Sequence, residues 1–306
     1  MGFLFLLIAI GFVLAKLKVT GDGTVSALSK LETYLFIPAI GMGTFMKQFT
    51  VEKLSVTWRL TLGSIAVEAV VIALSFLIVR FLTKDKYLRK IDQYGICFAN
   101  FGYFGNAIVS ALFPDLFTDY LIFTLMLWVG IIVWGAPSLM KTKGEEKGLS
   151  LGARLKKLLN PMILLMLLGM IIGISGLQLP AFIYTAVDSL GACMSPIAML
   201  LFGMILAKAQ FKTIFRHGSV YLMSGLRLLI LPGLFLLAAK LFGFSFEFTL
   251  LGVAAMSMPI GLNTIVIPAA YGEVPEEATG MVMLSHLASA LTIPFMFWLM
   301  AVIGFG

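Results

Sequence analysis

The chain has 306 residues, of which 60% are hydrophobic and only 12% carry a charge. Soluble domains have about 45–50% apolar and about 25% charged residues, and they need polar side chains to cover their surface. The composition therefore excludes a soluble protein and predicts an integral membrane protein. The net charge of +7 does not indicate a nucleic-acid partner, because Lys and Arg in membrane proteins commonly record orientation.

The apolar stretches of the chain have the length of membrane-spanning helices. A bilayer core of about 30 Å requires about 20 apolar residues in a helix. The sequence predicts ten spans, at residues 2–16, 28–47, 57–80, 91–113, 117–140, 160–176, 183–208, 218–241, 247–271 and 278–303. The first is short, but its Lys16 and Lys18 follow the apolar run instead of preceding it, unlike a signal peptide. We therefore expect an all-α, multi-pass membrane protein.

Basic residues are concentrated in alternate loops, after the first, third, fifth and seventh spans. The loops of the opposite side contain only Lys47, Lys53 and Lys240. Loops rich in Lys and Arg stay in the cytoplasm, so both termini are expected outside it and the hydrophilic linker at 141–157 inside it. This pattern predicts a plasma-membrane or inner-membrane protein. The linker separates two halves, 1–140 and 158–306, each with five predicted spans.

The two halves resemble each other at a nearly constant offset. Pro38 lies late in the second span, and Pro196 has a similar place in the seventh. Asn106-Ala-Ile-Val in the fourth span matches Asn263-Thr-Ile-Val in the ninth. Because each half has an odd number of spans, the second copy enters the membrane inverted. Inverted repeats are typical of secondary transporters, whereas the sequence has no HExxH or Gly-x-Ser-x-Gly motif of an enzyme.

Residues that interrupt helices are clustered in the fourth and ninth spans. The candidate substrate-binding residues are Asn100, Gly102, Gly105 and Asn106 in the fourth span and Ser257, Pro259, Gly261 and Asn263 in the ninth. Non-helical backbone survives at mid-membrane only inside protein or beside water. If both helices unwind there and cross, two helix N-termini and several unpaired peptide groups converge on a site suited to an anion. The alternative is that the glycines permit close helix packing and the amides bond between helices.

Three of the charged or titratable residues inside predicted spans, where such residues are costly and commonly functional, are candidates for a role in the site. Glu68 in the third span and Arg227 in the eighth occupy nearly equivalent positions of the two halves. They either pair with each other or act separately, as a proton-linked carboxylate and an anion-binding guanidinium. His286 in the tenth span either titrates near neutral pH or is a hydrogen-bonded packing residue. Pro38 and Pro196 are either hinges that border the site or simple kinks.

Four further residues have no expected role in the site. The spacing of Cys97 and Cys193 fits neither a zinc site nor a disulfide framework, so we expect free, buried thiols and no bound metal. Asp188 and Glu247 lie near the ends of predicted spans, where we expect them to cap a helix or face solvent.

Three stretches of the sequence have the pattern of a known transporter family. They are LSKLETYLFIPAI at 28–40, FANFGYFGN at 98–106 and AAMSMPIGLNTIVIPAAYGEVPEEATGMVMLSHLASALTIP at 254–294. Through them the whole chain resembles the auxin efflux carrier family, the bacterial relatives of plant PIN proteins. The resemblance implies two inverted five-helix repeats, with spans 1, 2, 6 and 7 as a scaffold domain and spans 3, 4, 5, 8, 9 and 10 as a transport domain. It also implies that spans 4 and 9 cross at the site, as in bile-acid symporters and sodium–proton antiporters.

The resemblance further implies a substrate class and a mechanism. Bacterial relatives are assigned to small carboxylates such as malate or malonate, and plant relatives export indole-3-acetate. Residues 100–106 and 257–263 match the family's crossing, although plant relatives have proline in both segments and this chain has only Pro259. We therefore expect an elevator-type carrier for a small organic anion, dimeric in the lipid, without a cofactor and either uncoupled or coupled to H⁺ or Na⁺. The alternatives are a sodium-coupled symporter of the bile-acid type and a membrane receptor or structural protein.

Overall fold

The computed structural model describes residues 2–21, 23–139, 152, 161–208, 217–270 and 276–305, and every regular element in these ranges is helical. Most of the predicted linker lies outside the described residues. The chain forms two compact units, each assembled from three separate stretches of sequence. Unit 1 consists of Met1–Trp58, Gly102–Leu121 and Leu158–Ala209, and unit 2 of Arg59–Phe101, Ile122–Lys157 and Gln210–Gly306.

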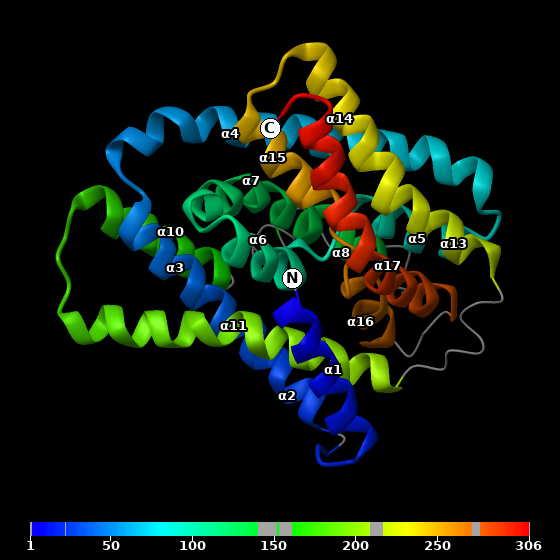
Figure 1. The fold of residues 1–306 in the computed structure, drawn as a ribbon, viewed down its shortest axis with the longest axis horizontal. Helices are drawn as coiled ribbons and strands as arrows, with labels where there is room; N and C mark the ends of the chain where they lie inside the picture. Colours follow the sequence, from blue (N-terminus) through cyan, green and yellow to red (C-terminus); the bar gives the residue numbers. More distant parts are fainter. Residues whose placement is uncertain are drawn as a thin grey trace. The chain divides into compact units, whose positions relative to one another are not determined.

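Unit 1 contains the long helix α11 (Ala181–Lys208). Its other α-helices are α1 (Gly2–Lys16), α2 (Thr24–Leu31), α3 (Ile37–Gln48), α6 (Asn106–Leu112) and α10 (Pro161–Ser175). Helix α3 packs against α10 and α11, and α1 crosses α11 (Figure 1). The backbones of α1 and α11 approach closely because glycine lies at the contact: a side chain on Gly203 would collide with the carbonyl oxygen of Ile8.

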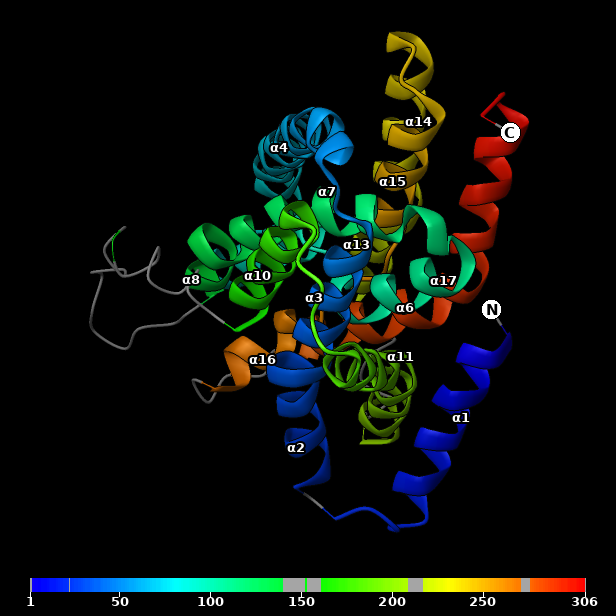
Figure 2. The same cartoon turned by 90° about the vertical axis from the view of Figure 1, so that its left-hand side faces the viewer.

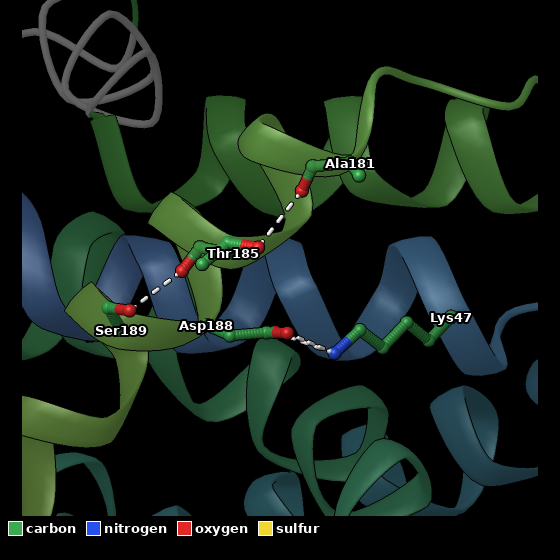
Figure 3. A network of polar contacts seen from close by, with 5 residues as sticks. All are labelled: Lys47, Ala181, Thr185, Asp188 and Ser189. Atoms are coloured by element: carbon green, nitrogen blue, oxygen red, sulfur yellow. Dashed lines mark hydrogen bonds and ion pairs between the residues drawn. The ribbon is translucent and has the colours of Figure 1, made fainter.

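An ion pair joins α3 to α11 in unit 1 (Figure 3). The Lys47 ammonium contacts the Asp188 carboxylate at 2.6 Å, while Thr185 and Ser189 bond carbonyls one turn earlier in α11. Asp188 does not cap a helix, because it lies inside α11, but its side chain is exposed, as expected, and binds the lysine of a neighbouring helix. Both side chains of the pair are nearly half exposed, so the pair contributes at most about 1 kcal/mol.

Unit 2 contains most of α4 (Val51–Leu82) and the last part of α7 (Phe117–Gly130), two helices that begin in unit 1. Its other α-helices are α5 (Lys86–Cys97), α8 (Ala136–Leu139), α13 (Gly218–Gly225), α14 (Leu231–Phe242), α15 (Phe246–Met256), α16 (Asn263–Ala270) and α17 (Glu276–Val302). A π-helical turn, Leu226–Ile230, joins α13 to α14. Helix α13 packs beside α17, and α14 beside α15 (Figure 2).

Five helices in the described ranges are long and apolar enough to cross a membrane. They are Thr57–Leu82, Pro114–Gly135, Ala181–Ala207, Gly218–Phe242 and Glu276–Val302, and four shorter apolar helices accompany them. The helical, multi-pass membrane character is therefore confirmed. The count of ten spans and the inverted repeat stay predictions, since several predicted spans are short or interrupted. The predicted span at 91–113, for example, is divided between α5 and α6.

The two prolines that match between the halves have different surroundings. Pro38 follows a π-helical turn, Glu32–Phe36, and is the second residue of α3. π-helical turns commonly occur where a helix accommodates an irregularity, such as the missing N–H of a proline. Pro196 instead lies inside α11, which continues beyond it to Lys208. The two positions are therefore not equivalent in local structure.

Both cysteines are free, but only one is buried. Cys97 is buried at the end of α5, as expected, whereas Cys193 is exposed on α11. The expectation for Cys193 is wrong because an apolar stretch of a membrane protein can face lipid, and its side chains are then exposed in the protein itself.

Candidate functional site

Two helices of unit 2 end inside predicted spans. Helix α5 ends at Cys97, and Phe98 has extended backbone angles, φ −115° and ψ 106°. Helix α15 ends at Met256, and the chain stays non-helical until α16 begins at Asn263. Both predicted interruptions are therefore present. Residues 98–100 and 257–262 are called the crossing below.

The two segments of the crossing bind each other through their backbones. The Asn100 N–H donates to the Pro259 carbonyl at 2.6 Å, and the Gly261 N–H donates to the Phe98 carbonyl at 3.0 Å, which makes an antiparallel bridge. An unpaired peptide group inside a bilayer costs several kcal/mol, and this pairing removes the cost for four groups. The expectation that unpaired peptide groups face a ligand is therefore wrong for these four.

Helix α17 holds the crossing through two polar side chains. The Asn100 amide nitrogen lies 2.9 Å from Nε2 of His286, whose Nδ1 lies 2.7 Å from the Val282 carbonyl. Because a carbonyl only accepts, Nδ1 of a neutral imidazole carries the proton, and Nε2 accepts from the amide. The Ser285 hydroxyl accepts the Ile260 N–H at 3.1 Å. His286 is buried and hydrogen-bonded, as the packing interpretation expects, and it also contacts a predicted site residue.

Arg227 binds the ends of both interrupted helices. Its Nη1 donates to the Ile96 carbonyl at 2.8 Å, Nη2 to the Ala255 carbonyl at 3.2 Å and Nε to the Met258 carbonyl at 3.3 Å. The last carbonyls of a helix lack partners within the helix and form its negative end, which favours a cation. The buried guanidinium therefore caps α5 and α15 together and fixes the crossing between them.

Glu68 lies near Arg227 without forming an ion pair with it among the described residues. Both line a cavity of about 20 Å³, together with Cys97 and Ala99, and this volume fits a single water molecule. Oε1 of Glu68 is buried and has no hydrogen-bond partner in the described part of the chain. The carboxyl fits against Gly130, where any side chain would collide with it. Of the two interpretations of Glu68 and Arg227, the paired one is not found in the part of the chain that the structure describes.

The predicted site residues are divided between the two units. Unit 2 contains Asn100 and all four candidates of the ninth span, and it also contains Glu68, Arg227 and His286. Gly102 and Gly105 lie in the π-helical turn Phe101–Gly105, and Asn106 begins α6 as a buried residue of unit 1. Pro38 and Pro196 also belong to unit 1. The structure therefore assembles Asn100, 257–263 and His286 within unit 2, whereas Asn106 belongs to unit 1.

Three buried acidic residues, Glu32, Asp92 and Asp119, were not predicted. Glu32 lies in the π-helical turn of unit 1, is fully buried, and has no hydrogen-bond partner for either carboxyl oxygen among the described residues. Its position inside the predicted span 28–47 was the available signal, because the rule that marks Glu68 as an intramembrane charge applies equally to Glu32. Ser285 was also missed, since a serine in an apolar helix gives no specific signal.

Comparison with known families places these features in context. A family model described as "Membrane transport protein" matches the chain twice, over residues 1–153 and 149–297. No curated protein matches the sequence.

Proposed function

Because the chain belongs to the auxin efflux carrier family of membrane transport proteins, we propose that it is a secondary carrier of a small organic anion, such as a carboxylate. The observation that supports this proposal best is the crossing, where two helices lose their regularity and bind each other through the backbone. Irregular backbone at membrane depth is typical of the binding sites of secondary transporters, which use the ends of broken helices to hold charged ligands.

The first turn of α16 is the proposed place for the anion. The N-terminus of a helix carries about half a positive charge and presents backbone N–H groups. Asn263 is the first residue of this helix and is partly exposed. The 20 Å³ cavity beside Glu68 is too small for a carboxylate substrate, which therefore binds elsewhere around the crossing.

Transport follows an elevator-type alternating-access cycle in this proposal, with H⁺ or Na⁺ as the candidate coupling ions. Glu68 and His286 are the candidates for proton coupling, because both are titratable and lie at or beside the crossing. Pro38 and Pro196 are the candidate hinges. A homodimer is the proposed assembly.

The experiment is uptake of labelled carboxylates into proteoliposomes that contain the Asn263→Ala variant. We expect at least a tenfold loss of uptake, because one lost hydrogen bond to a charged group corresponds to about 1.5–3 kcal/mol. The matched control is Gln178→Ala, which removes an amide from an exposed loop of unit 1, where Gln178 bonds only the Gly176 carbonyl weakly at 3.5 Å. Normal uptake by Asn263→Ala, with the variant folded, would overturn the assignment of the site.

The same vesicles distinguish the coupling modes. An imposed sodium gradient that drives uptake at constant pH would support the sodium-coupled symporter of the bile-acid type. Uptake that follows only the proton gradient or the membrane potential would support proton coupling or uncoupled transport. A thermal-shift screen of the purified protein against mono- and dicarboxylates identifies the substrate class, because a bound ligand stabilises the folded state by mass action.

A further inference from the structure

The hairpin formed by α4 and α5 in unit 2 has a large basic pocket. The pocket has a volume of about 690 Å³ and is lined by Ala73, Phe76, Leu77, Arg80, Lys86, Arg89, Lys90 and Gln93. Four of these eight residues are cations. It lies at the C-terminal end of the candidate span Thr57–Leu82, and hence at a surface of the membrane. We call it the hairpin pocket.

The acidic residues of the hairpin do not neutralise these cations. Asp85 caps α5 by accepting the backbone N–H groups of Tyr87 and Leu88, at 2.9 and 2.8 Å. Asp92 accepts the Thr83 hydroxyl at 2.5 Å. Both carboxylates therefore bind groups other than the cations, and the four cations outnumber them.

The cations themselves are available to a ligand. Arg80, Lys86 and Lys90 are exposed and form no ion pair with any described carboxylate. Arg89 is held in place because its Nε and Nη2 donate to the Thr83 carbonyl at 3.1 and 2.9 Å. Three exposed cations beside one oriented guanidinium form a suitable receptor for a phosphate, which accepts several charge-assisted hydrogen bonds.

The other wall of the hairpin pocket is apolar and continuous with the lipid-facing surface of α4. Phe76, Leu77 and Arg80 follow Ala73 by three, four and seven residues and thus share one face of the helix. Phe76 and Leu77 are 48% and 58% exposed, and only 22% of the α4 span is buried in the protein. A ligand with a phosphate at one end and hydrocarbon at the other fits this arrangement.

We propose that the hairpin pocket binds an anionic phospholipid, with the phosphate headgroup among the four cations and an acyl chain along Phe76 and Leu77. Basic pockets at the cytoplasmic ends of membrane helices bind such headgroups, and the excess of Lys and Arg in this loop predicts that it is cytoplasmic. A free phosphate ion would use the cations but would leave the apolar wall without a function.

The test compares binding of phosphatidylglycerol, phosphatidylcholine and glycerol 1-phosphate to the detergent-purified chain by native mass spectrometry. The test variant is Arg80→Gln/Lys86→Gln/Lys90→Gln. The matched control, Lys16→Gln/Lys18→Gln/Lys30→Gln, removes the same charge from another predicted cytoplasmic loop and the span ends beside it, in unit 1. At about 1 kcal/mol per cation, with 1.4 kcal/mol for each factor of ten, the test variant should bind phosphatidylglycerol roughly a hundredfold more weakly. The control should bind it like the parent.

A second variant keeps the proposal testable if the triple substitution impairs folding. Ala73→Trp leaves every charge in place and fills the apolar wall, so it should also weaken binding of phosphatidylglycerol. If the test and control variants lose binding of phosphatidylglycerol equally, the lipid is attracted non-specifically by the positive charge of the protein, and the proposal is overturned. A second contrary result is that glycerol 1-phosphate competes as strongly as the lipid while Ala73→Trp leaves binding unchanged. That result would identify a soluble phosphate ligand and would also overturn the proposal. None of these measurements depends on uptake, so the outcome is independent of the proposed carrier function.

Discussion

Replacing Arg227 by methionine removes the group that caps α5 and α15. The substitution keeps an unbranched apolar side chain in a buried position, but the carbonyls of Ile96, Ala255 and Met258 lose their donor. A buried polar group without its partner costs about 1–3 kcal/mol. For three carbonyls we expect Arg227→Met to lower the free energy of unfolding by about 3–9 kcal/mol, a large part of the about 5–15 kcal/mol that stabilises a typical domain.

The buried thiol of Cys97 gives a direct readout of this change. In a Cys193→Ala background, the exposed thiol is absent, and a thiol-reactive dye labels Cys97 only when unit 2 opens. We expect the midpoint of thermal labelling to fall by roughly 10 °C for Arg227→Met. Arg227→Lys should give an intermediate value, since an ammonium keeps the charge but lacks the planar arrangement of donors that reaches three separate carbonyls.

Two results would refute this reasoning. If Arg227→Met melts within about 2 °C of its parent, a shift worth about 1 kcal/mol or less, the guanidinium does not hold the helix ends. If Arg227→Lys melts like the parent, a point charge suffices, and the three directed hydrogen bonds do not stabilise the crossing.

Three further predictions concern other parts of the molecule. Gly203→Ala should destabilise the protein by about 1–3 kcal/mol, because the added methyl group collides with the backbone of α1. Gly233→Ala lies in open space within α14 and should instead stabilise the protein by about 0.5–1 kcal/mol. Thermal unfolding measures both changes. Asp188→Asn should change the stability by less than about 1 kcal/mol, because the ion pair with Lys47 is nearly half exposed; a larger loss in the same assay would show that the pair is more than a surface interaction. Glu68→Gln should leave the protein folded and abolish the pH dependence of uptake, if this carboxyl carries the coupled proton; an unchanged pH profile would exclude it.

The existence of the crossing was predictable, but its pairing was not. Glycine, proline and asparagine are concentrated at 100–106 and 257–263, and these residues favour non-helical backbone wherever they occur together. The hydrogen bonds between Asn100 and Pro259 and between Gly261 and Phe98 depend on the register of two distant segments. No local pattern determines that register, because it results from the packing of the whole unit.

The positions of the buried charged residues were predictable from the sequence, but their contacts were not. The cost of a charge inside a membrane marks Glu68 and Arg227 and should also have marked Glu32. Their partners were not predictable: near-equivalent positions in the two halves left open whether Glu68 and Arg227 pair, and the guanidinium binds helix-end carbonyls. A sequence does not indicate where helix ends meet in space, so a backbone partner is the kind of contact that such reasoning misses.

The crossing joins segments that are far apart in the sequence, so the fold is completed only late in synthesis. Arg227 follows Ile96 by 131 residues, and His286 follows Asn100 by 186 residues. At roughly 5–20 residues per second, the first interrupted helix waits on the order of ten seconds for its partners to leave the ribosome. Throughout that interval its free peptide groups need water or the insertion machinery to satisfy them. A chain that stops before α15 never acquires those partners, and we expect membrane quality-control proteases to degrade it.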